Sequence, residues 1–358
     1  MAFINDSVLP QGSIVLVTGA NGLVGANVVD IFLQFGFKVR GTVRDTQKHG
    51  WLVPFFEEKY GRGAFELVEV KDLLKEGVSA LIHIASDVSF GCNPHEVITP
   101  SVEGAINALK AAYAEPSVKR FIQCSSASAA VQGIPVGESP ITTTKDTYNE
   151  VAIALAWKEP YSAERGGDVY AASKTQQEQA IWKYHKEHQA RRSGLVVNTV
   201  MVEEHQAKNW EKECSRFELV VLPNLIFGKS LDKEKFGYPS TTGALAALFT
   251  GQAQPMHKML IGHYFVNIGD VARLFLAAAT FSDVQSERIF AFGGEFSFSK
   301  ALDIFRKHYP ERQFMENFSQ DHAWHTIPQR ERAEELLKRF CQPGWVQLEQ
   351  TVLDNVPL

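Results

Sequence analysis

Cysteine is scarce in this sequence. Its 358 residues contain four cysteines, which are far apart and form no Cys-x-x-Cys pair: Cys92, Cys124, Cys214 and Cys341. A disulfide scaffold and a zinc knuckle are therefore not indicated, because both need cysteines at close and regular spacings. We expect a protein of the reducing cytoplasm.

Long apolar runs and a strong excess of one charge are also missing. No apolar stretch approaches the roughly 18 residues of a membrane span, and the first residues do not resemble a secretory signal. Lysine and arginine number 36 and aspartate and glutamate 41, which gives a net charge of −5. A mildly acidic chain without a basic cluster argues against nucleic acid as the main partner. We expect neither a membrane nor a nucleic acid as partner.

No cluster of metal ligands stands out. His185 and His188 are three residues apart, as are His322 and His325, but neither pair has a clear third ligand. A metal site is therefore not expected. His83 follows an apolar run and is expected to be structural or to lie next to a cofactor.

The pattern that is present is that of an α/β protein. Apolar residues make up 45% and charged residues 22% of the chain, as in ordinary globular proteins. Continuous apolar runs predict parallel strands buried on both faces, at Ile14–Val17, Phe37–Val43, Phe65–Val70, Ala80–Ile84, Arg120–Cys124, Phe217–Leu222 and Arg288–Phe292. Helical patterns cover Leu23–Phe35, Val102–Tyr113, Thr147–Trp157, Ala171–His188 and much of Ser297–Leu358. This alternation predicts a Rossmann-type doubly wound sheet.

Three connections have unusual lengths. Only Lys71–Ser79 joins the third and fourth strands, which is too short for the usual crossover helix. Gln189–Glu213 is surplus and predicts a surface excursion, or a frayed helix and a short extra strand. Val131–Asp168 is too long for an ordinary connection, so we expect it to cover a site.

The first strand leads into a glycine turn and a helix. The segment Thr18-Gly19-Ala20-Asn21-Gly22-Leu23-Val24-Gly25 has the spacing T-G-x-x-G-x-x-G. The first glycine permits a tight turn, the second lets the backbone approach a pyrophosphate, and the third permits close helix–strand packing. The helix N-terminus offers N–H groups to the phosphates. We therefore expect a dinucleotide to contact Gly19, Asn21, Gly22, Leu23, Val24 and Gly25.

Positive charge follows the second predicted strand. Arg44 lies where the 2′-phosphate of NADP would be, and Lys48 follows on the loop. A guanidinium suits a phosphate because it can donate two parallel hydrogen bonds. The alternative is that Arg44 is solvated and Asp45 binds the ribose of NAD; we favour NADP(H). Residues after the third and fourth strands are also expected to line the cofactor: Asp72, Ala85 and Ser86.

Tyr170 and Lys174 lie four residues apart in a predicted helix, so their side chains share one face. A free tyrosine has a pKa near 10 and is a poor acid–base group at neutral pH. A neighbouring ammonium favours the phenolate and lowers that pKa toward the working range. Lys174 could also hold the nicotinamide ribose. The pair predicts hydride transfer between a nicotinamide and a carbonyl or alcohol carbon.

A serine pair, Ser125-Ser126, ends the fifth strand at the edge where α/β folds place ligands. A hydroxyl there can donate to a substrate oxygen on which charge develops. Such a pair is also typical of a helix cap or turn. Only its combination with the glycine turn and Tyr-x-x-x-Lys predicts an active site.

These three motifs, in this order, resemble those of the extended short-chain dehydrogenases/reductases. More specifically, the sequence is similar to the dihydroflavonol-4-reductase-like branch and, within it, to fungal and yeast NADPH-dependent aldehyde (carbonyl) reductases. The segments that carry this resemblance are Gly41–Asp45, His83–Ser86, Ser117–Phe121, Tyr170–Thr175, Leu222–Asn224, Phe265–Ala272 and Pro343–Trp345. The resemblance covers nearly the whole chain.

The resemblance implies a role for each motif. It implies that Ser126 is the catalytic serine, that Tyr170 donates the proton in reduction, and that Lys174 binds ribose and tunes Tyr170. Pro223 would border the nicotinamide, and the substrate pocket would be lined by Val88, Ser89, Phe90, Ile134, Leu225 and Tyr238, continuing to Thr242. Relative to this family, a helix between the third and fourth strands is missing, which would expose apolar strand surface, and Gln189–Glu213 is inserted.

The sequence thus predicts an NADP-dependent oxidoreductase that reduces an aldehyde or ketone to the alcohol. The expected substrate is a small hydrophobic or ring-bearing carbonyl compound, and the expected state is a monomer or homodimer. The dinucleotide-binding domain is expected at 1–222 plus about 255–292, and a smaller, mostly helical substrate-binding domain at 223–254 and 293–358. Two alternatives remain: an NAD-dependent epimerase, dehydratase or hydroxysteroid-type dehydrogenase, and a non-catalytic dinucleotide-binding protein.

Overall fold

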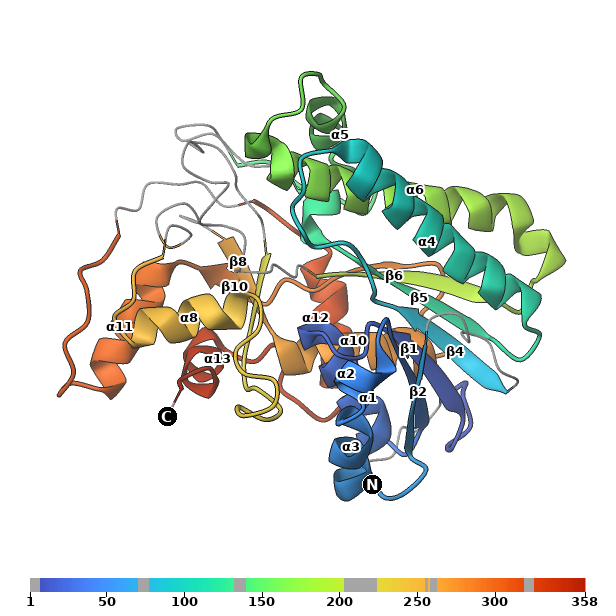
Figure 1. Cartoon of the computed structure of the whole chain (residues 1–358), viewed down its shortest axis with the longest axis horizontal. Helices are drawn as coiled ribbons and strands as arrows, with labels where there is room; N and C mark the ends of the chain where they lie inside the picture. The colour runs from blue at the N-terminus through green and yellow to red at the C-terminus, as the bar shows by residue number, and fades with distance from the viewer. Residues whose placement is uncertain are drawn as a thin grey trace.

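A seven-stranded parallel sheet runs through the larger part of the molecule (Figure 1). The computed structural model describes residues 7–69, 77–131, 140–202, 224–254, 257, 263–318 and 325–357. The strand order is β3-β2-β1-β4-β5-β6-β9, and every neighbouring pair is parallel. The strands are β1 Ile14–Thr18, β2 Lys38–Val43, β3 Phe65–Glu69, β4 Val78–His83, β5 Arg120–Ser125, β6 Val196–Met201 and β9 Arg288–Phe290. This order confirms the predicted Rossmann-type fold, in which ligands bind beyond the carboxyl ends of the strands where the strand order reverses, here β1 and β4.

Helices cover both faces of this sheet. One layer contains α1, α3, α10 and α12, and the other contains α4 and α6, with α5 packed on α6 (Figure 1). Their bounds are α1 Leu23–Gln34, α3 Leu52–Tyr60, α4 Pro94–Ala114, α5 Glu150–Ala156, α6 Gly166–His188, α10 Ile268–Thr280 and α12 Arg330–Lys338. The short elements near this sheet are α2 Thr46–His49, η2 Ala127–Ala129, η3 Ala163–Arg165 and η4 Gln189–Arg191.

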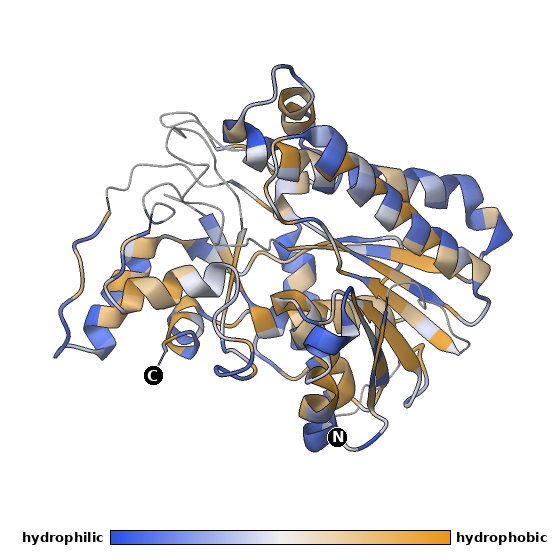
Figure 2. Cartoon of the chain, viewed as in Figure 1, coloured by the Kyte–Doolittle hydropathy of each residue, from blue (hydrophilic) through white to orange (hydrophobic). Residues whose placement is uncertain are grey.

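Alternation along the strands explains why both layers are needed. On β1, Val15 and Val17 pack with the α1 layer, whereas Leu16 packs with the α4 layer. All three side chains are fully buried. Figure 2 shows that the strands of this sheet are mainly hydrophobic, whereas hydrophilic residues recur along the helices that cover it.

A second, smaller sheet has the order β10-β8-β7. Its strands are β7 Asn224–Phe227, β8 His263–Asn267 and β10 Gly294–Phe296, and the helices beside it are α8 Thr241–Phe249, α11 Phe298–His308 and α13 Leu348–Asp354. One apolar cluster joins these elements to Phe90 and Tyr170 of the larger part. β8 falls within the segment 255–292 that we assigned to the dinucleotide-binding domain, while α10 of the same segment packs on α1. The domain boundaries stay a prediction.

The segment expected to be a surface excursion contains a central strand instead. Val196–Met201 forms β6, which pairs with β5 on one side and β9 on the other. The surface excursion was therefore wrong for residues 189–202, and the stated alternative, a frayed helix (η4) and a short extra strand, is confirmed there. The remainder of the predicted segment, 203–213, lies outside the described residues. The predicted strand Phe217–Leu222 lies outside the described residues.

The expected exposure of apolar strand surface is also wrong. Within the described ranges, the exposed large hydrophobic side chains are Val8, Val151 and Leu155, none of which lies in a strand. On β2, Arg40 points away from the α1 layer and forms an ion pair with Glu66 of β3. Arg40 is itself only 5% exposed, so this face of the sheet edge carries a buried, paired polar residue and, among the described residues, no exposed apolar surface.

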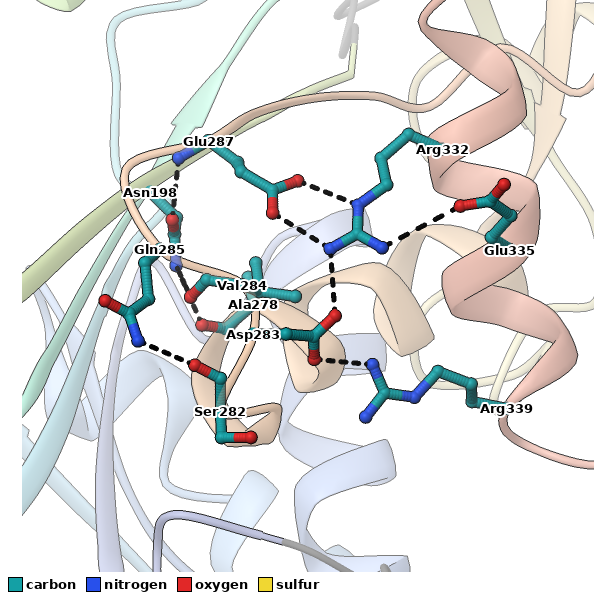
Figure 3. Close-up of polar contacts among 10 residues, drawn as sticks. All are labelled: Asn198, Ala278, Ser282, Asp283, Val284, Gln285, Glu287, Arg332, Glu335 and Arg339. Carbon is teal, nitrogen blue, oxygen red and sulfur yellow. Dashed lines mark hydrogen bonds and ion pairs between the residues drawn. The ribbon is translucent and has the colours of Figure 1, made fainter.

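Ion pairs fasten α12 to the loop before β9 (Figure 3). Arg332 Nη2 lies 2.9 Å from Glu287 Oε1 and 3.1 Å from Asp283 Oδ2, and Arg339 Nη1 lies 2.7 Å from Asp283 Oδ1. Asn198 of β6 accepts a hydrogen bond from the Glu287 backbone N–H at 2.9 Å. The loop is thus held from the helix side and from the sheet side.

Candidate active site

The glycine turn lies between β1 and α1, as predicted. Gly19 has φ +68°, a conformation that favours glycine, and its carbonyl accepts a hydrogen bond from Gly22 N–H at 3.1 Å. A Cβ on Gly25 would lie 2.0 Å from the Gly19 carbonyl oxygen. Gly22 is the N-cap of α1 and has no side-chain capping bond. The turn is therefore closed by backbone alone, and no side chain fits at Gly25.

Arg44 and Lys48 lie beside this turn. Ala20 N–H donates to Thr42 O at 3.1 Å, which ties the turn to the end of β2, and Arg44 follows two residues later with an exposed side chain. Asp45 caps α2 by accepting the Lys48 backbone N–H at 2.9 Å. Asp45, which would bind the ribose of NAD in the alternative prediction, is therefore the N-cap of α2.

Thr18 joins the turn to the end of β4. Its Oγ1 accepts from the backbone N–H groups of Ile84 and Ala85, both at 3.0 Å, and lies 3.1 Å from Nδ1 of His83. Burial, and next the charge of Lys174, lower the pKa of His83 to about 4. His83 is therefore an uncharged structural residue at neutral pH, next to the site.

Tyr170 and Lys174 lie in α6, which begins at Gly166, five residues before the predicted start at Ala171, and therefore includes Tyr170. Tyr170 is 1% and Lys174 4% exposed, and the Lys174 ammonium nitrogen lies 5.9 Å from the centre of the Tyr170 ring. α6 packs against β5 and against η2, the short helix that follows Ser126. The helix therefore brings the phenol and the ammonium together near the serine pair.

Phe90 covers the ring of Tyr170. The two rings are stacked with centroids 4.8 Å apart and an interplanar angle of 29°. Phe90 has φ +57°, a strained conformation for a bulky residue. A Cβ on Gly166, at the start of α6, would lie 2.2 Å from the Phe90 carbonyl oxygen. The close approach of this segment to α6 therefore depends on Gly166.

The two serines at the end of β5 have different partners. Ser125 Oγ donates to Glu178 Oε2 at 2.8 Å. Ser126 Oγ accepts the Ser128 backbone N–H at 3.1 Å and lies 2.6 Å from Ser128 Oγ. Both side chains are buried. The Ser125 hydroxyl is thus hydrogen-bonded to the Glu178 carboxylate, whereas the Ser126 hydroxyl is hydrogen-bonded to the hydroxyl of Ser128.

The other predicted positions divide into three groups. Leu225 is buried in the apolar cluster that contains Phe90 and Tyr170, and Val88 packs against it. Three other side chains lie elsewhere or have other partners. Ser86 Oγ accepts a hydrogen bond from Gln177 Nε2 of α6 at 3.4 Å, and Ser89 is exposed. The Tyr238 hydroxyl donates to Val356 O at 3.3 Å. Three predicted residues lie outside the described residues: Asp72, Ile134 and Pro223.

Sequence reasoning missed several residues near the serine pair. Glu178 lies four residues after Lys174 and eight after Tyr170, so the same helical spacing that links those two could have identified it. Arg288 could not have been found in this way, because its ion pair with Glu178 spans 110 residues of sequence.

Neither a metal centre nor a membrane span was found in the part of the chain that the structure describes. No group of three or more His, Cys, Asp or Glu side chains there is placed to hold a metal ion. Likewise, none of the helices in the described ranges has the length and apolar character needed to cross a bilayer.

Comparison with known proteins agrees with this geometry. The sequence profile of the NAD dependent epimerase/dehydratase family matches residues 15–217. The chain is similar to the NAD-dependent epimerase/dehydratase terH of Aspergillus terreus (35% identity, 98% of each chain). It is also similar to aldehyde reductase 2 of Sporidiobolus salmonicolor (36% identity, 99% of this chain and 98% of the relative). The structure of Gre2 from Candida albicans in complex with NADPH has a TM-score of 0.74 at 20% identity, over 96% of this chain and 97% of that one.

The profile match and the two relatives together confirm the predicted resemblance to extended short-chain reductases of fungal type. The chain belongs to the NAD-dependent epimerase/dehydratase family.

Proposed function

We propose that this protein is an NADPH-dependent reductase that converts an aldehyde or ketone to the alcohol. The observation that carries the proposal is the buried pair Tyr170 and Lys174 on α6, packed beside the segment that begins with Ser126. The relative from Sporidiobolus salmonicolor is named an aldehyde reductase, and Gre2 from Candida albicans was crystallised with NADPH. These names support a carbonyl reductase.

The residues at the carboxyl edge of the sheet fit a dinucleotide. The space that a Cβ would occupy at Gly25 is filled by backbone, which brings the α1 N-terminus close to β1. Gly19, Asn21, Gly22, Leu23, Val24 and Gly25 would hold the pyrophosphate, Ala85 and Ser86 would line the site, and Lys174 would hold the nicotinamide ribose. When bound, NADPH supplies a hydride to the carbonyl carbon.

Arg44 supports NADPH rather than NADH. Its guanidinium is exposed at the end of β2, where a 2′-phosphate would lie, and Lys48 is on the adjoining helix. The Asp45 carboxylate accepts a backbone N–H of α2 and would repel a phosphate less than a free carboxylate would.

In the proposed mechanism, Tyr170 donates its phenolic proton to the substrate oxygen as charge develops there. The ammonium of Lys174, 5.9 Å from the centre of the Tyr170 ring, stabilises the phenolate that remains. Ser126 Oγ already accepts the N–H of Ser128, so its own proton can be donated to the substrate oxygen. Phe90, stacked on Tyr170, and Leu225 would give the substrate site an apolar wall.

One alternative has a specific observation in its favour. The relative from Aspergillus terreus is named an NAD-dependent epimerase/dehydratase. An enzyme of that kind would retain NAD tightly through the catalytic cycle and would not consume NADPH. Analysis of the nucleotide released from the purified, denatured protein separates the two possibilities.

The test is a reductase assay with purified protein. NADPH or NADH is mixed with aromatic aldehydes, α- and β-keto esters and cyclic ketones, and the absorbance of the reduced cofactor is followed. We expect oxidation of NADPH with at least one apolar carbonyl compound. No oxidation with any substrate, together with no binding of NADPH, would overturn the proposal.

A further inference from the structure

Glu178 is a fully buried carboxylate that the proposed mechanism does not use. It lies on α6, on the face that carries Tyr170 and Lys174. Its two oxygens accept five hydrogen bonds. The donors are Ser125 Oγ (2.8 Å), Thr199 Oγ1 (2.8 Å), Arg288 Nε (2.8 Å), Arg288 Nη2 (3.2 Å) and Trp182 Nε1 (3.4 Å).

Arg288, at the start of β9, neutralises this carboxylate. The side chain of Arg288 is 7% exposed, and its Nη1 also donates to the carbonyl oxygens of Lys145 and Thr147. Its guanidinium lies 4.2 Å from the centre of the Tyr148 ring. Burial opposes the charged form of Glu178, but Arg288 and the two hydroxyl donors outweigh it and hold the pKa of Glu178 below its usual range.

A buried ion pair is weak evidence for a purely stabilising role. Removing two charges from water is costly, and well-packed apolar residues of similar volume are often as stable or more stable. The hydrogen bonds of this pair instead lead, directly or through residues 145–149, to one segment, residues 125–129, which contains Ser126. Ser125 immediately precedes Ser126, and the Lys145 and Thr147 carbonyls lead into Asn149.

Asn149 holds the other end of the same segment. Its Nδ2 donates to Ser128 O at 3.0 Å, and its backbone N–H donates to Ala129 O at 2.9 Å. Ser126 therefore lies between two points of attachment. Both of them lead back to Arg288, one through Glu178 and one through residues 145–149.

Resting on the proposed reductase function, we infer that the Glu178–Arg288 pair is a positioning device for the active site, which fixes Ser126 against Tyr170 and Lys174. The pair links α6, the end of β5 and the loop before α5 through directed hydrogen bonds. Glu178 and Arg288 are not among the residues proposed to contact substrate or cofactor. They act through Ser125 and Asn149.

The network around Arg332 offers a matched control. Arg332 of α12 forms ion pairs with Glu287 and Asp283 of the same loop that leads into β9, and with Glu335 of its own helix, but not with Glu178 (Figure 3). Loss of Arg332 weakens the attachment of α12 without removing any hydrogen bond of Ser125 or Glu178. It therefore separates general stability from positioning.

The experiment compares the full-length parent with Ser125→Ala, Glu178→Gln, the double variant Glu178→Leu/Arg288→Met and Arg332→Ala. Four quantities are measured for each protein: kcat and KM for the carbonyl substrate that the parent turns over, the NADPH dissociation constant by fluorescence, and Tm. Ser125→Ala removes one donor and leaves the ion pair in place, so it tests positioning even if Glu178→Gln does not fold. The double variant replaces the buried ion pair with apolar residues, so it tests whether Tm recovers while kcat does not.

We expect kcat to fall about tenfold or more in Glu178→Gln and severalfold in Ser125→Ala, because small displacements of a reacting group are costly. The NADPH dissociation constant should stay within about twofold of the parent value, because neither residue lies at the proposed cofactor site. The double variant should recover Tm but not kcat, and Arg332→Ala should lose Tm but not kcat.

Parent-like kcat in Ser125→Ala, or recovery of kcat by the double variant, would overturn the inference while leaving the reductase proposal intact. A parent that turns over no carbonyl compound would instead overturn the proposed function and, with it, the inference. A fall in kcat that simply follows Tm across all variants, Arg332→Ala included, would show a structural role and would also overturn the inference.

Discussion

At Gly25 the position of a side chain is already occupied by the Gly19 carbonyl oxygen, 2.0 Å from where a Cβ would be. We predict that Gly25→Ala lowers the free energy of unfolding by about 1–3 kcal/mol, because the turn must open to admit the methyl group. NADPH affinity should fall as well. Calorimetry and fluorescence titration measure the two effects.

Gly104 provides the control for this substitution. It lies in α4, is exposed, and has no atom within 4 Å of an added Cβ. Gly104→Ala should be neutral or stabilise the protein by about 0.5–1 kcal/mol, as alanine does in a helix interior. Equal effects of the two substitutions would contradict the close packing at Gly25.

Arg44 is expected to decide between the two nicotinamide cofactors. Arg44→Ala should raise KM for NADPH roughly tenfold to a hundredfold, which is the loss of a charge-assisted hydrogen bond to a phosphate. KM for NADH should change little. Arg62→Ala is the matched control, because Arg62 is exposed and precedes β3 at the amino ends of the strands, whereas Arg44 follows β2 at their carboxyl ends. An unchanged cofactor preference in Arg44→Ala would exclude Arg44 as the phosphate ligand.

Among the elements, α6 was predictable and its surroundings were not. The spacing of Tyr170 and Lys174 predicted a shared helical face, and the helix Gly166–His188 carries both. The partner of Glu178 is Arg288, which is 110 residues away in sequence. Local patterns report on neighbours along one helix or strand, so a contact of this range follows only from the folded chain.

β6 was predicted only as an alternative to a surface excursion, for a physical reason. Its sequence, Val196–Met201, includes Asn198 and Thr199, which interrupt the apolar run expected of a buried strand. Both side chains are fully buried but hydrogen-bonded. Asn198 Nδ2 donates to Ala278 O at 3.0 Å, and Thr199 Oγ1 donates to Glu178 at 2.8 Å. A buried polar residue with partners from other elements looks, in sequence alone, like a surface residue.

α12 depends on its ion pairs with the loop before β9. Arg332→Ala removes the contacts to Glu287 and Asp283 (Figure 3). Because Arg332 is partly exposed, we predict a loss of about 1 kcal/mol, which corresponds to about 2–4 °C in Tm. Differential scanning calorimetry measures the shift, and raising the salt concentration should reduce the difference from the parent. A Tm equal to that of the parent at low salt would contradict this contribution.

For the whole molecule, His83 links stability to pH. Burial, and next Lys174, lower its pKa from 6.5 to about 4 in the folded protein, so the unfolded chain binds a proton more readily. The stability that depends on uncharged His83 is complete above pH 6.5 and is lost as the pH falls toward 4. The loss amounts to about 3 kcal/mol over that window.

Chemical denaturation at several pH values measures this dependence. His83→Gln should flatten the slope of unfolding free energy between pH 6.5 and 4, because glutamine does not titrate. Loss of absolute stability in the variant does not matter for this comparison. A slope identical to that of the parent would show that His83 binds its proton equally well in the folded and the unfolded chain, and would contradict the lowered pKa.

The sequence was most informative about the sheet's carboxyl edge and least informative about the substrate side. The glycine turn, Arg44 and Tyr170 follow local patterns whose geometry is set by one turn or one helix. The stacking of Phe90 on Tyr170 depends instead on a positive φ at Phe90 and on Gly166, which no local pattern indicates. Tyr238, expected at the substrate, donates to Val356 near the chain's end.

The most direct test of the proposed chemistry is the activity of Tyr170→Phe. The substitution removes one hydroxyl and keeps the ring that stacks on Phe90, so folding and NADPH binding should be those of the parent. With the carbonyl substrate that the parent reduces, we predict that kcat falls about a hundredfold or more, the loss of a positioned general acid. A Tyr170→Phe protein that consumes NADPH as fast as the parent would contradict the mechanism.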